Sequence, residues 1–316
     1  MSQDVMNCPA CSRRTPSARA SCLYCGAALP VTRIEVAPPQ RAIDSIEHAF
    51  NTILQPPRRQ PDEQTEAALA AALNIEATEA RALVGAGQWL PVARSQSPQE
   101  AELIAALVRT CGLGAIVVGD EELQLETEIV RARRIVRGQG ELEVHHSGGV
   151  MTAPLSDVKL MVVGALRNTR VDYTEGISGV RSAGGTVFDS AEFRGEETLL
   201  DVYSTSLNHS FRMKADAFDY SGLVWPLSFR AELNFQTAIS ALHGAAPRAV
   251  VDDSFARIRG LLARAWPERT RTEARGVKRT GLAYRPVARS SVISDNRDQF
   301  ERYSRLMFLS SVSSNQ

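Results

Sequence analysis

The sequence has almost no lysine and no long apolar segment. Only three of its 36 basic residues are lysine, and the other 33 are arginine; we interpret this bias as the composition of a GC-rich bacterial genome. No apolar run approaches the roughly 20 residues that a membrane-spanning helix needs. Since no apolar signal segment precedes the first cysteine either, the sequence predicts a cytoplasmic protein with no membrane partner.

Cysteine is scarce beyond the N-terminus. Four of the five cysteines form two CxxC pairs, at residues 8–11 and 22–25, and only Cys111 lies elsewhere. A secreted disulfide scaffold is therefore not expected. Two CxxC pairs at this separation are typical of a four-thiolate zinc site, because each pair turns two thiolates toward one tetrahedral ion. The sequence predicts one structural zinc ion, with these ligands: Cys8, Cys11, Cys22 and Cys25.

These two cysteine pairs resemble the zinc-ribbon domains at the N-termini of many bacterial proteins. Residues 1–30 contain too few large apolar side chains to fold alone, so the metal is expected to supply the stability. Paired disulfides or a redox CxxC are the alternatives, and zinc is favoured over both. Four thiolates leave no position for a catalytic water. The arginines of this module are interpreted as an ordinary solvated loop, with a nucleic-acid contact as the alternative.

The net charge of zero conceals a gradient along the chain. Residues 1–60 carry a net charge of +3, residues 61–244 carry −10, and residues 245–316 carry +7. A basic C-terminal segment can fold against the acidic body or reach an external polyanion. The intramolecular interpretation is favoured because it requires no partner.

A proline-rich linker is expected at residues 31–61, after the ribbon. Proline pairs at residues 38–39 and 56–57 disfavour a continuous helix. Between them, residues 41–54 place apolar side chains at three-to-four spacing, which predicts an amphipathic helix. This helix would dock on its own chain or enter a partner's groove.

Residues 62–123 predict a small α/β module. Helices are expected at 62–74 and 76–84, and strands at 89–93 and 115–118. Between the strands, Ser97 and Glu100 form a capping box with proline at the first helical position, and this helix ends at Cys111. Strand, helix and strand in this order predict a right-handed βαβ crossover. The pattern resembles the C-terminal domain of the ribosomal stalk protein and similar adaptor domains.

Residues 124–266 predict a β-rich domain with closing helices. Short alternating segments separated by glycines indicate strands within 129–136, 141–144, 158–166, 198–203 and 210–213. Helices are expected at 228–242 and 251–265. Several strands closed by one amphipathic helix resemble pleckstrin-homology-like barrels, which implies a barrel-like fold here.

A basic tail is expected at residues 267–316. Its first part, 268–294, is rich in arginine and has almost no apolar periodicity, which predicts a flexible segment. Asp295 is expected to cap a final helix whose apolar face docks elsewhere on the chain.

Other candidate sites are interpreted as structural. The adjacent His145 and His146 point to opposite sides of a strand and cannot readily share a metal ion. His209 and His243 lack ligand-spaced neighbours, and Cys111 lies at a helix C-terminus, where the dipole disfavours a thiolate. The glycine-rich stretch 176–185 lacks a phosphate-loop lysine, and the carboxylates at 252–253 fit helix capping.

Together these features predict a multidomain α+β protein that is not an enzyme. Its expected parts are a zinc ribbon, a linker, a small α/β module, a β-rich barrel-like domain and a basic tail. The predicted function is a zinc-binding adaptor that mediates protein–protein interaction with a partner not identified by the sequence. The alternative is a nucleic-acid-associated protein that uses the ribbon and the arginine-rich tail. No catalytic or cofactor-binding residues are predicted.

Overall fold

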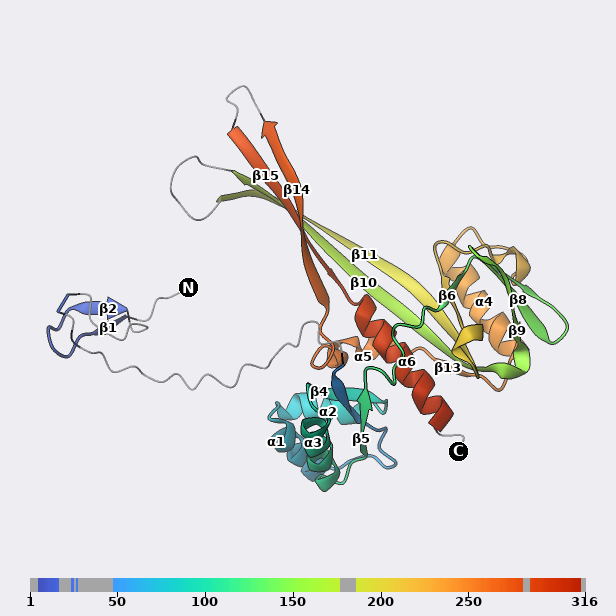
Figure 1. Cartoon of the computed structure of the whole chain (residues 1–316), viewed down its shortest axis with the longest axis horizontal. Coiled ribbons are helices and arrows are strands. Elements are labelled where there is room, and N and C mark those ends of the chain that lie inside the picture. Colours follow the sequence, from blue (N-terminus) through green and yellow to red (C-terminus); the bar gives the residue numbers. More distant parts are fainter. Residues whose placement is uncertain are drawn as a thin grey trace. The chain divides into compact units, whose positions relative to one another are not determined.

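The computed structural model describes residues 5–16, 24, 25, 27, 48–176, 186–280 and 285–313. The fold is mixed α/β, with six α-helices and several sheets among the described residues. The chain forms two compact units, Met1–Ile43 and Asp44–Gln316, which are treated separately below (Figure 1).

The first unit contains a two-stranded antiparallel sheet in its described part. Strand β1 (Val5–Asn7) pairs with β2 (Arg14–Pro16), and Cys8 follows β1 directly. The second CxxC pair is described only at Cys25, because Cys22 lies outside the described residues. The ribbon fold of residues 1–30 therefore stays a prediction.

The second unit begins with a three-stranded sheet in the order β4-β3-β5. Strand β3 (Phe50–Leu54) is antiparallel to both β4 (Leu90–Ser95) and β5 (Ala115–Gly119). Strands β4 and β5 are consequently parallel to each other, as expected for a strand-helix-strand crossover. They are not neighbours, however, because β3 lies between them.

The helices of this module begin as their sequences predict. Asp62 caps α1 (Glu63–Leu73) by accepting a hydrogen bond from the Thr65 amide at 2.8 Å. Ser97 caps α3 (Pro98–Thr110) by accepting from the Glu100 amide at 3.1 Å. Between them lies α2 (Ala77–Gly85). These caps satisfy amide donors that have no partner within their own helix.

The predicted helix over residues 41–54 is wrong where the structure describes it. Residues 50–54 form β3, and residues 41–47 lie outside the described part. Residues 51–54 are all buried, since the central strand is covered on both faces. A strand buried on both faces has no alternation of polar and apolar residues, so its apolar spacing also matched a helix.

The largest sheet has seven strands and is open. Its order is β14-β15-β10-β11-β12-β6, and β13 pairs in parallel with β10. The strands are β6 (Val130–Ala132), β10 (Val158–Gly176), β11 (Thr186–Ser204), β12 (Phe211–Lys214), β13 (Val250–Asp252), β14 (Arg269–Thr280) and β15 (Arg285–Asp295).

A separate antiparallel sheet contains β7 (Arg134–Arg137), β8 (Glu141–His146) and β9 (Gly149–Pro154). No closed barrel forms among the described residues, so the barrel-like expectation is wrong. The reason is the length of β10 and β11: they pair with each other from end to end, and the edge strands β14 and β6 never meet.

The arginine-rich segment 268–294, predicted to be flexible, is largely a hairpin. Strands β14 and β15 pair with each other, and β15 also pairs with β10 from Asp295↔Asn168 to Val287↔Gly176. Backbone hydrogen bonds to strands on both sides order β15, although its sequence has almost no apolar periodicity. The pair β10–β11 and the pair β14–β15 together form a single-layered four-stranded extension. We call it the arm and define it as residues 168–176, 186–197, 269–280 and 285–295. Figure 1 shows these strands running side by side beyond the helices.

Two hydrophobic clusters cover opposite faces of β10 and β11. Leu160 and Val162 belong to the first cluster, and Met161 between them belongs to the second. The first also contains the core of the α/β module, α5 (Phe255–Leu262) and three residues of α6 (Arg297–Ser313): Phe300, Tyr303 and Leu306. The second contains α4 (Ala231–Ala245) and the sheet of β7 to β9. The three predicted C-terminal helices are confirmed, and the apolar face of the last one is docked.

Candidate functional site

Three of the four predicted zinc ligands lie together in the first unit. The Sγ atoms of Cys8, Cys11 and Cys25 are all within 4.8 Å of one another, and those of Cys8 and Cys25 are 3.7 Å apart. Cys8 is buried, Cys11 is half-buried and Cys25 is exposed. Cys22 lies outside the described residues.

The backbone around Cys8 turns the first CxxC pair back on itself. The Cys8 amide donates to the Arg13 carbonyl at 2.9 Å, and the Ser12 amide donates to the Cys8 carbonyl at 2.8 Å. Ser12 has a positive φ of 58°. This turn, closed by β1 and β2, brings both sulfur atoms of the pair to one side.

The spacing of the sulfur atoms fits a metal ion. Tetrahedral coordination with zinc–sulfur bonds of about 2.3 Å places sulfur atoms about 3.8 Å apart. The distance of 3.7 Å between Cys8 and Cys25 agrees with this value and is far longer than a disulfide bond of about 2.05 Å. The three cysteines can therefore bind a metal ion, and a fourth ligand would complete the tetrahedron.

In the part of the chain that the structure describes, the histidines and Cys111 do not belong to a group of three ligand-type side chains. Among the described residues, the cysteine trio is the only group of three or more ligand-type side chains close enough to hold an ion. His145 and His146 lie on β8, where His146 Nδ1 accepts from the Gly148 amide at 3.2 Å. Cys111 caps the end of α3, and its thiol donates to the Leu107 carbonyl at 3.4 Å.

Asp252 belongs to a buried hydrogen-bond cluster instead of a carboxylate pair. Its Oδ1 accepts from the Ser254 amide at 3.0 Å, and its Oδ2 accepts from the Tyr303 hydroxyl at 2.6 Å. The cluster ties the start of α5 to α6. Burial first, and then the Asp252 charge, raise the pKa of Tyr303, so this hydroxyl stays protonated and acts as a donor.

A second buried cluster joins α6 to β11 and β12. The Arg212 guanidinium donates from Nε to Asp201 Oδ1 at 2.6 Å and from Nη2 to Oδ2 at 2.9 Å, and Ser304 donates to the same carboxylate at 2.8 Å. Glu301 also pairs with Arg212, at 3.1 Å. Burial would lower the pKa of Arg212, but the two carboxylates outweigh burial and raise it. The charge of Arg212 is thus balanced by the two carboxylates, and these contacts hold α6 against β11 and β12.

A third cluster connects the α/β module to the C-terminal region. Arg94 donates to Asp120 at 2.8 Å, Asn51 bonds both residues, and the Trp266 indole donates to Asn51 Oδ1 at 2.8 Å. Burial alone would raise the pKa of Asp120, but the hydrogen bonds and the charges of Arg94 and Arg302 lower it. None of these three clusters was predicted from the sequence, because their members lie up to 215 positions apart.

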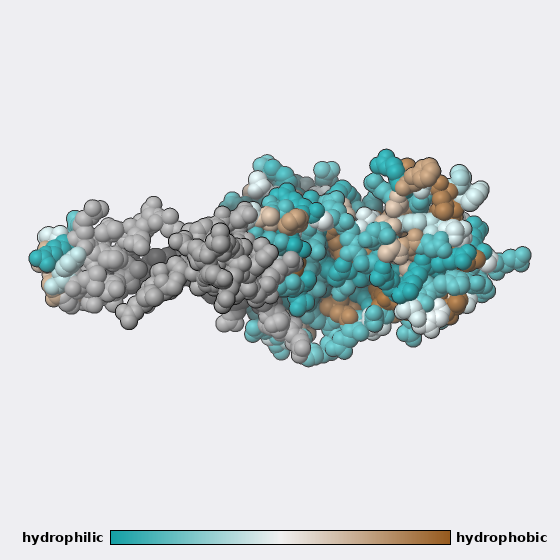
Figure 2. All heavy atoms as spheres, turned by 90° about the horizontal axis from the view of Figure 1, so that it is seen from above, coloured by the Kyte–Doolittle hydropathy of each residue, from teal (hydrophilic) through white to brown (hydrophobic). Residues whose placement is uncertain are grey.

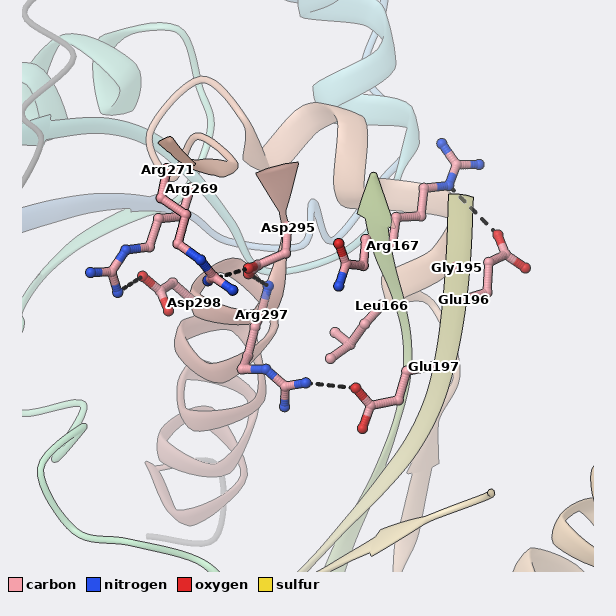
Figure 3. Close-up of a pocket in the computed structure, with 11 residues that line it drawn as sticks. Leu166, Arg167, Gly195, Glu196, Glu197, Arg269, Arg271, Asp295, Arg297 and Asp298 are labelled. Carbon is pink, nitrogen blue, oxygen red and sulfur yellow. Dashed lines mark hydrogen bonds and ion pairs between the residues drawn. The ribbon is translucent and has the colours of Figure 1, made fainter. Parts of the chain in front are cut away.

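A charged hollow of about 340 Å³ lies where the arm meets the start of α6. Figure 3 shows its arginines pointing toward carboxylates. The ion pairs are Arg297–Glu197 at 2.6 Å, Arg271–Asp295 at 3.3 Å, Arg269–Asp298 at 3.5 Å and Arg167–Glu196 at 3.7 Å. Each arginine is thus paired with a carboxylate of the same chain, so the hollow offers no uncompensated charge to a ligand.

One exposed apolar loop was missed by the sequence reasoning. Trp225 is 88% exposed, Phe229 is fully exposed, and Leu227 and Leu233 are nearly half-exposed. Figure 2 shows hydrophobic patches on a surface that is otherwise largely hydrophilic. The run Trp-Pro-Leu-Ser-Phe, which overlaps the start of the helix predicted at 228–242, was the available signal, since it fits neither strand nor helix periodicity.

No protein-family model matches this chain, and no similar curated protein or solved structure was found. Within the described residues, no helix has both the length and the apolar character needed to span a membrane.

Proposed function

We propose that the protein is a non-enzymatic adaptor whose arm binds an extended segment of a partner protein. The supporting observation is the outer edge of β11. Strand β12 pairs with β11 only at residues 199–202, so residues 186–197 have no strand beside their outer edge in the described part of the chain.

One hydrogen bond shows which residues of this edge point their backbone N–H and C=O groups away from β10. The Ala215 amide donates to the Thr198 carbonyl at 3.0 Å, so the peptide groups of Thr198 face away from β10. In an antiparallel strand, alternate residues point their N–H and C=O groups to the same side. The outward groups are therefore those of Ser190, Glu192, Arg194 and Glu196.

Such an edge is a template for a further strand. Charged side chains along it discourage indiscriminate pairing, and the backbone groups remain able to bond an extended peptide. Residues 190–196 are all exposed. An adaptor that adds a partner strand here requires no catalytic group.

The N-terminal unit is proposed to be a zinc-stabilised ribbon. The thiolates of Cys8, Cys11 and Cys25, completed by Cys22, would hold the ion, which supplies folding energy to a module with little apolar core. We assign this unit no chemical step.

A second candidate function is nucleic-acid binding by β14 and β15. These two strands carry seven basic residues and two acidic ones, a net charge of +5. Against this candidate, Arg269 and Arg271 already pair with acidic residues of the same chain. A phosphate backbone would have to displace those carboxylates.

The test uses a proline that removes one outward N–H. Arg194→Pro should leave the fold intact, because the Arg194 amide faces solvent and proline is tolerated at such edge positions. Arg194→Ala is the matched control, since it removes the same side chain and keeps the N–H. Partners are first identified by cross-linking in the native organism, and each is then purified and titrated against both variants.

We expect the partner to bind Arg194→Ala like the original chain and to lose affinity for Arg194→Pro. Equal affinity for the two variants would show that this edge is not used. Binding of DNA or RNA with a steep negative salt slope, lost when β14 and β15 are removed, would favour the second candidate instead.

A further inference from the structure

The exposed loop at residues 225–229 has the composition of an interfacial anchor. Trp225 and Phe229 project almost completely into solvent, and Leu227 between them is 46% exposed. The first residues of α4 extend the same surface through Leu233, which is 47% exposed. An exposed apolar patch of this kind marks a binding surface, because such side chains are otherwise buried.

The loop is held in place by a buried asparagine. Asn234 is 8% exposed, and its side chain accepts from the Ser228 amide at 2.7 Å and donates to the Ser228 carbonyl at 2.8 Å. The Arg230 amide in turn donates to the Ser228 hydroxyl at 3.2 Å. Phe229, which lies between Ser228 and Arg230, is therefore presented by a fixed backbone, which reduces the entropy lost on binding.

A basic segment, residues 130–137, contacts the turn that leads into this loop. Residues 130–137 contain four exposed arginines and no acidic residue: Arg131, Arg133, Arg134 and Arg137. The Asp219 amide donates to the Arg133 carbonyl at 2.8 Å, and a Cβ at Gly222 would collide with the Ile135 carbonyl oxygen. The helical turn η3 (Tyr220–Gly222) thus packs directly against β7, three residues before Trp225.

Most of this positive charge is available to an external anion. Arg134 pairs with Asp219 at 3.7 Å. In the described part of the chain, Arg131, Arg133 and Arg137 have no ion-pair partner. This contrasts with the hollow at the base of the arm, where each arginine is paired with a carboxylate.

We propose that the loop 225–229 and the arginines of residues 130–137 together dock the protein on the surface of an anionic lipid bilayer. Tryptophan prefers the bilayer interface, phenylalanine and leucine enter the acyl boundary, and arginines beside them attract acidic headgroups. The apolar groups project from a loop and do not line a groove, which suits insertion into a deformable surface. This revises the sequence-based expectation of no membrane partner, and it is independent of the arm.

The decisive reporter is Trp225 itself. The other two tryptophans are Trp266, which is 2% exposed, and Trp89, which is half-buried, so Trp225 dominates the exposed indole signal. Full-length protein is mixed with vesicles of phosphatidylcholine alone or of phosphatidylcholine with phosphatidylglycerol. Sedimentation measures binding, and tryptophan emission measures transfer of the indole out of water.

We expect sedimentation with the anionic vesicles only, together with a blue shift of the emission. Trp225→Phe should still bind and should lose the shift. Trp225→Ser combined with Phe229→Ser should reduce binding to background, whereas Val150→Ser, at an exposed position on β9, should leave it unchanged. Folding of each variant is checked by circular dichroism.

The electrostatic part is tested separately. Arg131→Gln and Arg137→Gln should each lower the vesicle partition coefficient about five-fold, which corresponds to about 1 kcal/mol per arginine near an anionic surface. Arg59→Gln, at an exposed arginine between β3 and α1, is the matched control. Added salt should weaken binding of the original chain.

Three results would overturn the proposal: no sedimentation with anionic vesicles, binding that survives the double serine substitution, or an emission spectrum that vesicles do not change. Loss of a protein partner in the double variant without vesicle binding would assign the loop to a protein surface instead. Each outcome leaves the test of Arg194→Pro unaffected, since that variant alters a different element.

Discussion

Helix α6 approaches β10 so closely at Gly164 that only glycine fits. Gly164 is buried, and a Cβ at this position would lie 2.5 to 2.8 Å from three atoms of the Phe300 ring. The ring cannot move away freely, because Phe300 is fully buried and packs edge-on against Phe255 with centroids 5.0 Å apart. Gly164→Ala therefore forces α6 or the ring to shift.

The expected cost of Gly164→Ala is about 1–3 kcal/mol of unfolding free energy, the usual range for overpacking a filled core. The compensating change is Phe300→Leu, which removes ring atoms from the contact. Phe300→Leu has its own cost from lost burial, but Gly164→Ala added to it should cost less than it does alone. Urea denaturation followed by circular dichroism gives all four free energies of the cycle.

The cycle has a clear refuting result. If the close approach to Phe300 is the cause, the two substitutions are coupled and their effects are not additive. Additivity within about 0.5 kcal/mol would show that the cost of Gly164→Ala arises elsewhere, and the close packing of α6 on β10 would be refuted.

Three further predictions follow from the metal site, a buried carboxylate and the arm. Purified protein should contain one zinc per chain, and Cys22→Ser should abolish it while leaving the far-ultraviolet spectrum of the remainder intact; metal analysis without zinc, on fully reduced thiols, would contradict this. Since the pKa of Asp120 is lowered in the folded state, its ionised form contributes stability above the unfolded value of about 4, and this contribution is lost as the pH falls through the folded-state pKa. The urea midpoint of Asp120→Asn should accordingly depend less on acid pH than that of the original chain; identical profiles would exclude this role. Amides of residues 287–295 should exchange slowly with deuterium because β15 is paired on both sides, and exchange at the rate of an unstructured peptide would refute the pairing.

Local signals predicted local structure well. Ser97 with Glu100 located the start of α3, and apolar spacing located α4, α5 and α6. These features depend on residues within one or two helical turns, so the sequence contains all the information they need. The two CxxC pairs are also a local signal, and three of the four cysteines lie together in the structure.

Features that depend on distant residues were not predicted. The apolar spacing of residues 50–54 also fits a helix, and pairing with β4 and β5 makes this segment a strand. The arginine-rich segment has no apolar periodicity, and β15 forms because it pairs with β14 and β10. In both cases the missing quantity is the burial or backbone pairing supplied by elements far along the chain. The barrel-like expectation failed for the same reason, because strand number and polarity do not specify whether the sheet edges meet.

The polar contacts of α6 explain why the C-terminal helix unites the second unit. Gln299 donates to the Trp266 carbonyl at 2.9 Å, Tyr303 bonds Asp252, and Ser304 bonds the carboxylate held by Arg212. Apolar contacts alone would allow a helix to rotate or slide on a sheet, since the hydrophobic effect is non-directional. Hydrogen bonds to Trp266 and to groups on β13 and β11 fix both its rotation and its position along its axis. The position of α6 also fixes the base of the arm, because Arg297 at the start of this helix pairs with Glu197 of β11.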